Sequence, residues 1–179
     1  MLLGLQSRHL QADQTTMTRL FLDTEWADAA ATELVSIGLV TQDGQRRFYA
    51  EMATLPEHPT GFVREVVYPL LERGEAALPH AEFTRRLRAF LVLIDHPVVL
   101  FDYAADGVFL KFALDGFGLT EDMGIYPTVR FSLIGFGDVT TNVERYFREH
   151  PDAAARRHHA GVDAEALRWG FVQAMRGPG

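Results

Sequence analysis

The feature that most limits the fold is a change of hydrophobic period about one third of the way along the chain. Residues 19–23 and 33–41 are short apolar segments of the kind that forms buried strands. Gln42-Asp43-Gly44-Gln45 follows the second segment, and Asp-Gly is a strong signal for a hairpin turn. Residues 46–51 then predict a returning strand. The first part of the chain therefore predicts an antiparallel half-sheet.

Helical spacing replaces the strand pattern from residue 62 onward. Residues 62–73 carry apolar side chains at helical spacing, although Pro69 should kink or end that helix. The next helix opens at Leu78-Pro79-His80 and should end at Pro97. Its predicted buried stripe is Phe83, Leu87, Phe90, Leu91 and Ile94.

The remainder alternates between strand and helix. Residues 98–101 predict a central strand parallel to the first one. Residues 128–133 predict a last strand, and residues 139–150 and 163–175 predict helices. Residues 105–114 predict a helix with four inward side chains, namely Val108, Phe109, Phe112 and Ala113. The order is typical of an α/β layer fold and fits a ribonuclease H-like sheet of antiparallel and then parallel strands, flanked by helices.

Length and composition predict one domain. The chain has 179 residues, of which residues 1–16 are expected to be a tail and residues 17–179 a single domain; Met17 is an alternative start. The absence of cysteine excludes disulfides and thiol chemistry, and fits the cytoplasm. No apolar run approaches the roughly 18 residues of a membrane span, so we expect no membrane partner. The net charge of −7 argues against coating nucleic acid by charge, and leaves open whether the surplus acids form a metal site or a solvated surface.

Asp23-Thr24-Glu25 is the first motif with chemical potential, because it follows a buried strand. Residues two apart in a strand face the same side, so Asp23 and Glu25 are expected to point into one cleft. Two such carboxylates repel each other unless a cation lies between them, and their hard oxygens suit Mg²⁺ or Mn²⁺. Taken alone, a D-x-E sequence is a weak signal, because most examples are surface acids.

Asp106 lies just after the central strand, at the head of a predicted helix. Ligands of open α/β sheets gather at the carboxyl ends of strands, which favours a site role. The alternative is a plain helix cap. Asp102 competes for the same role, since it is nearer the end of the strand.

The third motif is His158 followed five residues later by Asp163. If Gly161 precedes the last helix, Asp163 lies in its first turn and His158 lies on the loop above it. An imidazole titrates near neutrality and is therefore a candidate general base. The alternative is an ordinary loop histidine beside Arg156 and Arg157.

Together the three motifs resemble the DEDDh class of 3′–5′ exonucleases, which belongs to the DnaQ-like superfamily. That class carries D-x-E on the first strand, an Asp in a pattern like F-D-x-x-F-L, and H-x-x-x-x-D near the end. The matching positions are Asp23 and Glu25, Asp106 with Phe109-Leu110, and His158 with Asp163. The D-T-E motif with a following aromatic residue, and E-L-V-S-I-G soon after, is most similar to the small RNase AS-type exoribonucleases.

There are departures from the family pattern as well. A polar His-Asn pair often precedes the second Asp, and Phe101-Asp102 stands in its place here. Trp26 stands where many relatives have Thr or Phe. Neither departure removes an expected ligand.

The resemblance implies hydrolysis supported by two divalent cations, Mg²⁺ or Mn²⁺. Asp23, Glu25 and Asp163 would bind one cation, and Asp23 and Asp106 would hold the second. His158 would accept a proton from the attacking water, and the product would be a nucleoside 5′-monophosphate.

The resemblance also implies a substrate and an assembly. The expected substrate is single-stranded RNA, with adenylate-rich RNA as one candidate, and the expected assembly is a homodimer. Substrate contacts are expected at Thr24, Trp26 and Arg157; Trp26 either stacks on the terminal base or closes the core. The alternatives are an oligoribonuclease, a DNA-proofreading exonuclease, and a nucleic-acid-binding module without catalysis.

Overall fold

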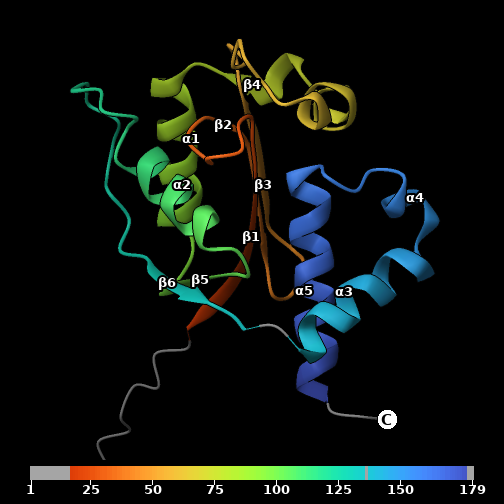
Figure 1. Cartoon of the computed structure of the whole chain (residues 1–179). Coiled ribbons are helices and arrows are strands. Elements are labelled where there is room, and N and C mark those ends of the chain that lie inside the picture. Colours follow the sequence, from red (N-terminus) through yellow and green to blue (C-terminus); the bar gives the residue numbers. More distant parts are fainter. Residues whose placement is uncertain (1–16, 136, 177–179) are drawn as a thin grey trace, which may run out of the picture.

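Strand β1 (Thr18–Trp26) organises a mixed sheet of six strands in the order β4-β3-β2-β1-β5-β6 (Figure 1). The computed structural model describes residues 17–135 and 137–176, so the predicted tail at residues 1–16 lies outside the described residues. Strand β1 pairs antiparallel with β2 and parallel with β5. The other strands are β2 (Leu34–Thr41), β3 (Arg47–Met52), β4 (Ala77–Leu78), β5 (Pro97–Phe101) and β6 (Arg130–Leu133).

The hairpin between β2 and β3 confirms the turn predicted from Asp43-Gly44. Gly44 has a φ of 74°, a conformation that glycine adopts without strain, and its N–H donates to the carbonyl of Thr41 at 2.8 Å. The carboxylate of Asp43 accepts a hydrogen bond from the Gln45 N–H at 3.0 Å. The antiparallel start and the parallel β5 are both confirmed, and the fold class is α/β.

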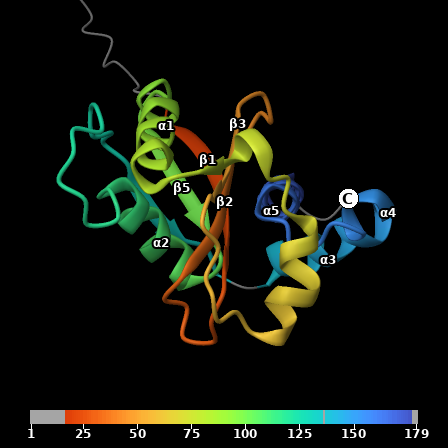
Figure 2. The same cartoon turned by 90° about the horizontal axis from the view of Figure 1, so that it is seen from above.

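Helices cover both faces of the sheet, as Figures 1 and 2 show. One face carries α1 (His80–Val92) and α2 (Ala104–Leu114), which pack on the even-numbered side chains of β1, such as Leu20 and Leu22. The other face carries α5 (Ala160–Arg176) and α3 (Asp138–Glu149), which pack around Phe21. The short α4 (Pro151–Ala154) connects α3 to the loop before α5.

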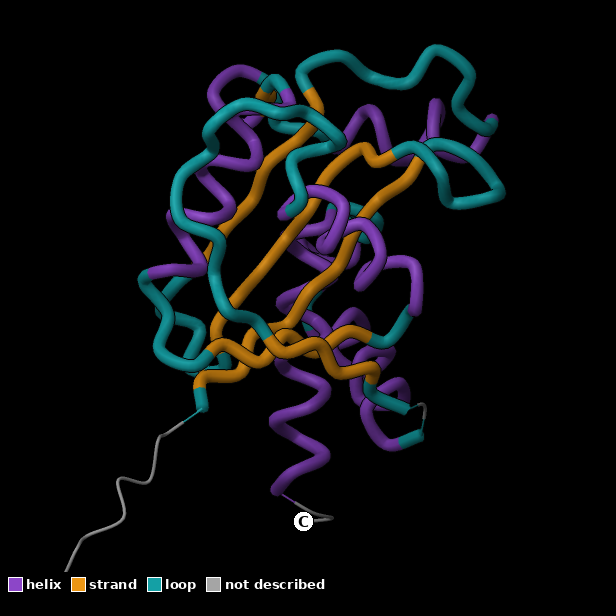
Figure 3. The backbone as a smooth tube through the Cα atoms, turned by 90° about the vertical axis from the view of Figure 1, so that its left-hand side faces the viewer, coloured by secondary structure: helices purple, strands orange, loops and turns teal. Residues whose placement is uncertain are grey.

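A long loop joins α2 to β6 and passes outside α2, which the tube in Figure 3 makes easy to follow. In residues 17–135 and 137–176, no helix combines the length and the apolar composition needed to cross a membrane.

The structure corrects three predictions about helices. Residues 62–73 contain a π-helical turn, Val63–Val67, and a 3-10 turn, Tyr68–Leu70, in place of a regular α-helix. The segment does end at Leu70, next to Pro69, as predicted from the missing N–H of proline. Helix α1 ends at Val92, and Pro97 instead begins β5.

The third error concerns the inward face of α2. Phe109 and Ala113 are buried as predicted, but Val108 is 67% exposed and Phe112 is 46% exposed. The helix turns a stripe that includes Asp106 and Leu110 toward the sheet, which leaves Val108 and Phe112 on its outer side. The two-residue β4 and the four-residue α4 were not predicted, because such short elements carry no period. The 3-10 turn Gly74–Ala76 precedes β4.

The start of α5 lies directly on β2 because Gly38 has no side chain. A Cβ at Gly38 would overlap the carbonyl group of Ala160, the first residue of α5. Gly38 is paired with Asp23 across the β1–β2 ladder. The close approach therefore places the first turn of α5 next to the functional end of β1.

Replacing Gly38 with Ala should destabilise the protein, because neither backbone can yield without moving α5. Overpacking of this kind costs about 1–3 kcal/mol, which corresponds to a fall in the melting temperature of roughly 3–10 °C for a chain of this size. Gly61→Ala is the matched control, since a Cβ there meets open space. Thermal unfolding followed by circular dichroism measures both; equal melting temperatures for the two variants would contradict the close approach.

Candidate functional site

Asp23 and Glu25 occupy alternate positions near the carboxyl end of β1, on the face that α5 covers. Asp163 lies in the first turn of α5, as predicted, but α5 begins at Ala160, so Gly161 lies inside the helix and not before it. The charge of Asp163 adds to the charges of Asp23 and Glu25. Because Gly38 has no side chain, the start of α5 can lie directly on the sheet. The Asp23-Thr24-Glu25 motif and the His158–Asp163 motif therefore meet on one side of β1.

Asp106 reaches the same place from the opposite layer. It lies in the first turn of α2 and is almost fully buried. The hydroxyl of Thr24 donates a hydrogen bond to Oδ1 of Asp106 at 2.7 Å, which joins β1 to α2. Thr24 is only 3% exposed, so its side chain orients Asp106 from within the protein.

The acids line one pocket of about 510 Å³ at the carboxyl ends of β1 and β5. The five residues predicted to be catalytic all belong to its lining: Asp23, Glu25, Asp106, His158 and Asp163. Asp102 also lines the pocket, so both acids that competed in the sequence are present there. The motif spacing therefore identified residues that the fold brings together.

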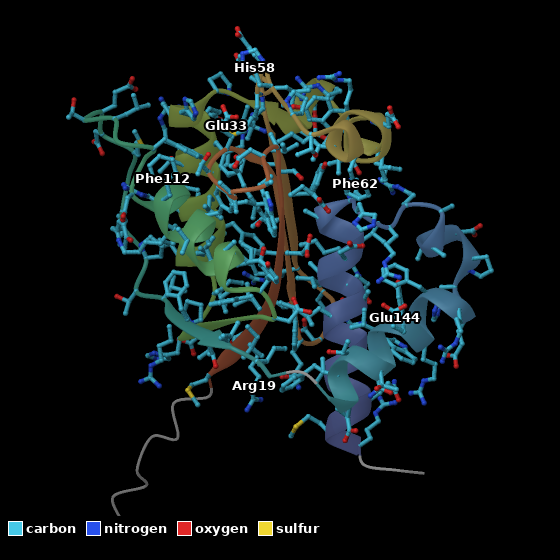
Figure 4. All side chains as sticks on the ribbon, in the orientation of Figure 1. Arg19, Glu33, His58, Phe62, Phe112 and Glu144 are labelled. Carbon is cyan, nitrogen blue, oxygen red and sulfur yellow. The ribbon has the colours of Figure 1, made fainter. Side chains whose placement is uncertain are left out.

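His158 enters the pocket from the loop before α5. Its N–H donates to Oδ2 of Asp163 at 3.1 Å, and its ring meets the ring of Phe62 edge-on with the centroids 4.9 Å apart. One ligand atom each from Glu25, His158 and Asp163 lie within 4.8 Å of one another. In Figure 4 the labelled Phe62 lies near the end of α5 that carries this loop.

Burial and mutual repulsion raise the pKa of the four clustered acids of the pocket, Asp23, Glu25, Asp106 and Asp163. Desolvation, followed by repulsion from Asp163 and Asp106, raises the pKa of Glu25 to about 9. Desolvation raises the pKa of Asp106 and of Asp163 to about 7 each, although hydrogen bonds from Thr24 and His158 act in the opposite direction. The pKa of Asp23 is raised well above its ordinary value, first by burial and then by the neighbouring carboxylates.

The oxygen atoms of the pocket fit a hard divalent cation. Within the described residues, Asp23 Oδ2, Asp106 Oδ2 and Asp163 Oδ1 are buried and have no hydrogen-bond partner. A buried carboxylate oxygen without a partner is costly, and carboxylates this close repel each other. Positive charge at their centre would relieve both effects, and a donor set made mainly of carboxylate oxygens suits Mg²⁺ or Mn²⁺.

The residues predicted to contact substrate have different surroundings. Trp26 lines the pocket and stacks between Tyr103 and Phe109, with centroid distances of 5.5 and 6.0 Å, so it takes part in both the pocket wall and the core packing. Arg157 also lines the pocket, where both terminal nitrogens bind Glu144, at 2.6 and 3.1 Å. Thr24 lines it too, with its hydroxyl directed at Asp106.

Sequence reasoning missed two aromatic residues of the pocket. Tyr103 is 57% exposed beside Trp26. Phe62, the first apolar residue of the helical pattern over residues 62–73, is exposed against His158. Tyr103 lies between Asp102 and Asp106 in the sequence, so its place inside a motif was the available signal. The sequence carries no signal that Phe62 lies in the pocket, since Phe62 belongs to no motif and its helical pattern is broken by Pro69.

Comparison with known proteins gives no relative to guide the interpretation: no family model matches the chain, and no curated protein matches it. The function is therefore inferred from the residues of the pocket and from the resemblance of its motifs.

In the absence of divalent cations, stability should fall as the pH rises from about 5 to about 8. The folded acids have raised pKa values, so the folded state binds more protons than the unfolded state in this window, and unfolding becomes easier as those protons leave. Asp23→Asn removes one of the repelling charges. In EDTA it should melt above the wild type at about pH 8 and close to it at about pH 5.

Millimolar Mn²⁺ should raise the melting temperature of the wild type at about pH 8 and should have much less effect on Asp23→Asn. Differential scanning calorimetry measures both proteins in EDTA at about pH 5 and about pH 8, and in Mn²⁺ at about pH 8. If the melting temperature of the wild type changed neither with pH nor with Mn²⁺, the clustered acids would not affect stability through their charges.

Proposed function

We propose that this protein is a metal-dependent 3′–5′ exoribonuclease that resembles the DEDDh class and releases nucleoside 5′-monophosphates from single-stranded RNA. The observation that carries the proposal is the meeting of Asp23, Glu25, Asp106, Asp163 and His158 in one pocket. Each motif has an ordinary alternative when taken alone. Their convergence from both sides of the sheet is not expected of surface acids or of a simple helix cap.

The acids would hold the cations of the proposed reaction. Asp23, Glu25 and Asp163 are suited to one divalent cation, and Asp23 and Asp106 to a second. When bound, two such cations stabilise charge on the attacking and the leaving oxygen of an in-line phosphoryl displacement. Thr24 fixes the rotation of the Asp106 carboxylate, because the Thr24 hydroxyl donates a hydrogen bond to one of the two carboxylate oxygens.

His158 is the proposed general base. Burial, followed by the charge of Arg157, lowers its pKa, so its ring is neutral and able to accept a proton at pH 7. The oxygen of water forms a bond to phosphorus, the bond from phosphorus to the 3′ oxygen breaks, and the water proton passes to His158. The leaving 3′ oxygen takes a proton from solvent, which leaves a shortened RNA with a free 3′ hydroxyl.

Several coarser features support the same proposal. A sheet of antiparallel and then parallel strands, with helices on both faces, is compatible with a ribonuclease H-like fold. The absence of cysteine, which fits the cytoplasm, adds a cytoplasmic location to the proposal, and the resemblance adds a homodimer. With a net charge of −7, selectivity for RNA has to come from the pocket itself.

Asp23→Asn should abolish hydrolysis, with a fall in kcat of at least about a thousandfold, because it removes a charge shared by both proposed cation sites. Asp95→Asn is the matched control: Asp95 is highly exposed and precedes the opposite end of β5. The measurement uses 5′-labelled single-stranded RNA with Mg²⁺ and with EDTA, and follows which end shortens.

The same assay separates the candidates. Parallel reactions with adenylate-rich RNA, RNA of two to five nucleotides, and single-stranded DNA distinguish a general exoribonuclease from an oligoribonuclease and from a DNA exonuclease. Binding of RNA without cleavage in Mg²⁺ and in Mn²⁺ would favour the non-catalytic module. Full activity of Asp23→Asn would end the proposal.

Tyr103→Ala should raise KM for RNA more than it lowers kcat. Its exposed ring lines the pocket and stacks on Trp26. Stacking on a base contributes about 1–3 kcal/mol, or roughly five- to 150-fold in affinity. Tyr126→Ala, which changes a partly exposed tyrosine on the loop between α2 and β6, is the control. Steady-state kinetics would contradict the stacking role if KM were the same in both variants.

A further inference from the structure

His158 is held in a backbone conformation that few residues other than glycine adopt. Its φ is 75°, in the left-handed region, where a side chain is strained. Such a conformation persists only where the surroundings fix it. One restraint is the hydrogen bond from its N–H to Asp163. A second restraint has to act on the other side of His158, where the chain enters α5.

The next residue, His159, is a buried anchor for this turn. It is only 4% exposed, and its ring stacks on the ring of Tyr49 with the centroids 4.2 Å apart and an angle of 19° between the planes. Its carbonyl accepts the N–H groups of Val162 at 2.8 Å and Asp163 at 3.0 Å. Side chain and main chain of His159 therefore tie the turn to β3 and to the start of α5.

Tyr49 is itself fixed in place. Its hydroxyl donates to Oε1 of Glu51 at 2.7 Å, and Glu51 is fully buried. Glu51 also accepts the N–H groups of Glu72 at 2.5 Å and Arg73 at 3.1 Å. The surface on which His159 stacks is thus a network that joins β3 to the segment before β4.

The ring of His159 acts through its shape. Among the described residues, neither of its ring nitrogens has a hydrogen-bond partner; Nε2 lies 3.4 Å from Oε1 of Glu72, and burial lowers the pKa of the ring, which keeps it neutral. Gly161 packs against the ring edge, where a side chain would be crowded. A flat ring of this size, without its nitrogens, would fill the same space.

We propose that His159 is a positioning residue: its ring, stacked on Tyr49, locks the strained turn that presents His158 to Glu25 and Asp163. The inference rests on the proposed function for the role of His158 in hydrolysis. The positioning itself is a geometric statement and can be tested without any activity.

The test compares His159→Ala, which removes the stack, with His159→Phe, which keeps a flat ring and cannot transfer a proton. His150→Ala is the matched control, because His150 also stacks on a tyrosine, Tyr146, at 4.3 Å and 26°. The first readout is the nuclear Overhauser effect between the rings of His158 and Phe62, which are in contact in the structure. We expect it in the wild type, in His150→Ala and in His159→Phe, and not in His159→Ala.

The second readout is RNA hydrolysis. His159→Ala should lower kcat about ten- to a hundredfold with little change in KM, whereas His159→Phe should stay close to the wild type. His158→Ala should lose about 10²- to 10⁴-fold. The double variant His158→Ala/His159→Ala should lose no more than His158→Ala, because His159 acts only through His158.

The outcomes are decisive in both directions. Circular dichroism checks each variant for folding, and His159→Phe decides the matter if His159→Ala does not fold. An unchanged Overhauser effect in His159→Ala, additive losses in the double variant, or a His159→Phe that loses the Overhauser effect or is as inactive as His159→Ala, would overturn the proposal. A wild type that cleaves no RNA would end the proposed function and leave the Overhauser test to decide the positioning.

Discussion

The contact between Gly38 and the backbone of Ala160 is the constraint on which the rest of the site depends. Strand β1 fixes Asp23 and Glu25 by its alternation, but alternation alone brings no third acid to them. Asp163 lies near them because α5 begins in van der Waals contact with β2 at Gly38, the residue that is paired with Asp23. One missing side chain on β2 thus sets the distance between two motifs that lie at opposite ends of the domain in sequence.

The pocket also illustrates a balance between stability and chemistry. Four clustered acids, three of them with an unpartnered buried oxygen, oppose folding, as their raised pKa values indicate. The remainder of the sheet compensates through ordinary apolar packing on both faces, around Leu22 on one and Phe21 on the other. The unfavourable repulsion among the acids is thus located at a place where a bound cation would reduce it and stabilise the folded state.

The sequence was most informative where a local pattern has a local physical cause. The Asp43-Gly44 turn and the alternation of Asp23 and Glu25 follow from turn chemistry and strand period. It was uninformative where the cause is tertiary. No periodicity distinguishes the exposed Val108 from the buried Phe109, because the direction in which α2 faces the sheet is decided by its neighbours. The close approach at Gly38 and the stack of His159 on Tyr49 likewise involve residues far apart in the chain.

The two-sided construction of the pocket has a consequence for how the molecule matures. Thr24 joins Asp106 from the α2 layer, while Asp163 comes from the α5 layer, so β1 serves both halves at once. Neither half is complete until its own layer has docked, and α5 is the last helix of the described chain to be synthesised. During translation Asp163 therefore reaches the other three acids only after α5 has left the ribosome, and a truncated chain that ends before α5 lacks this acid.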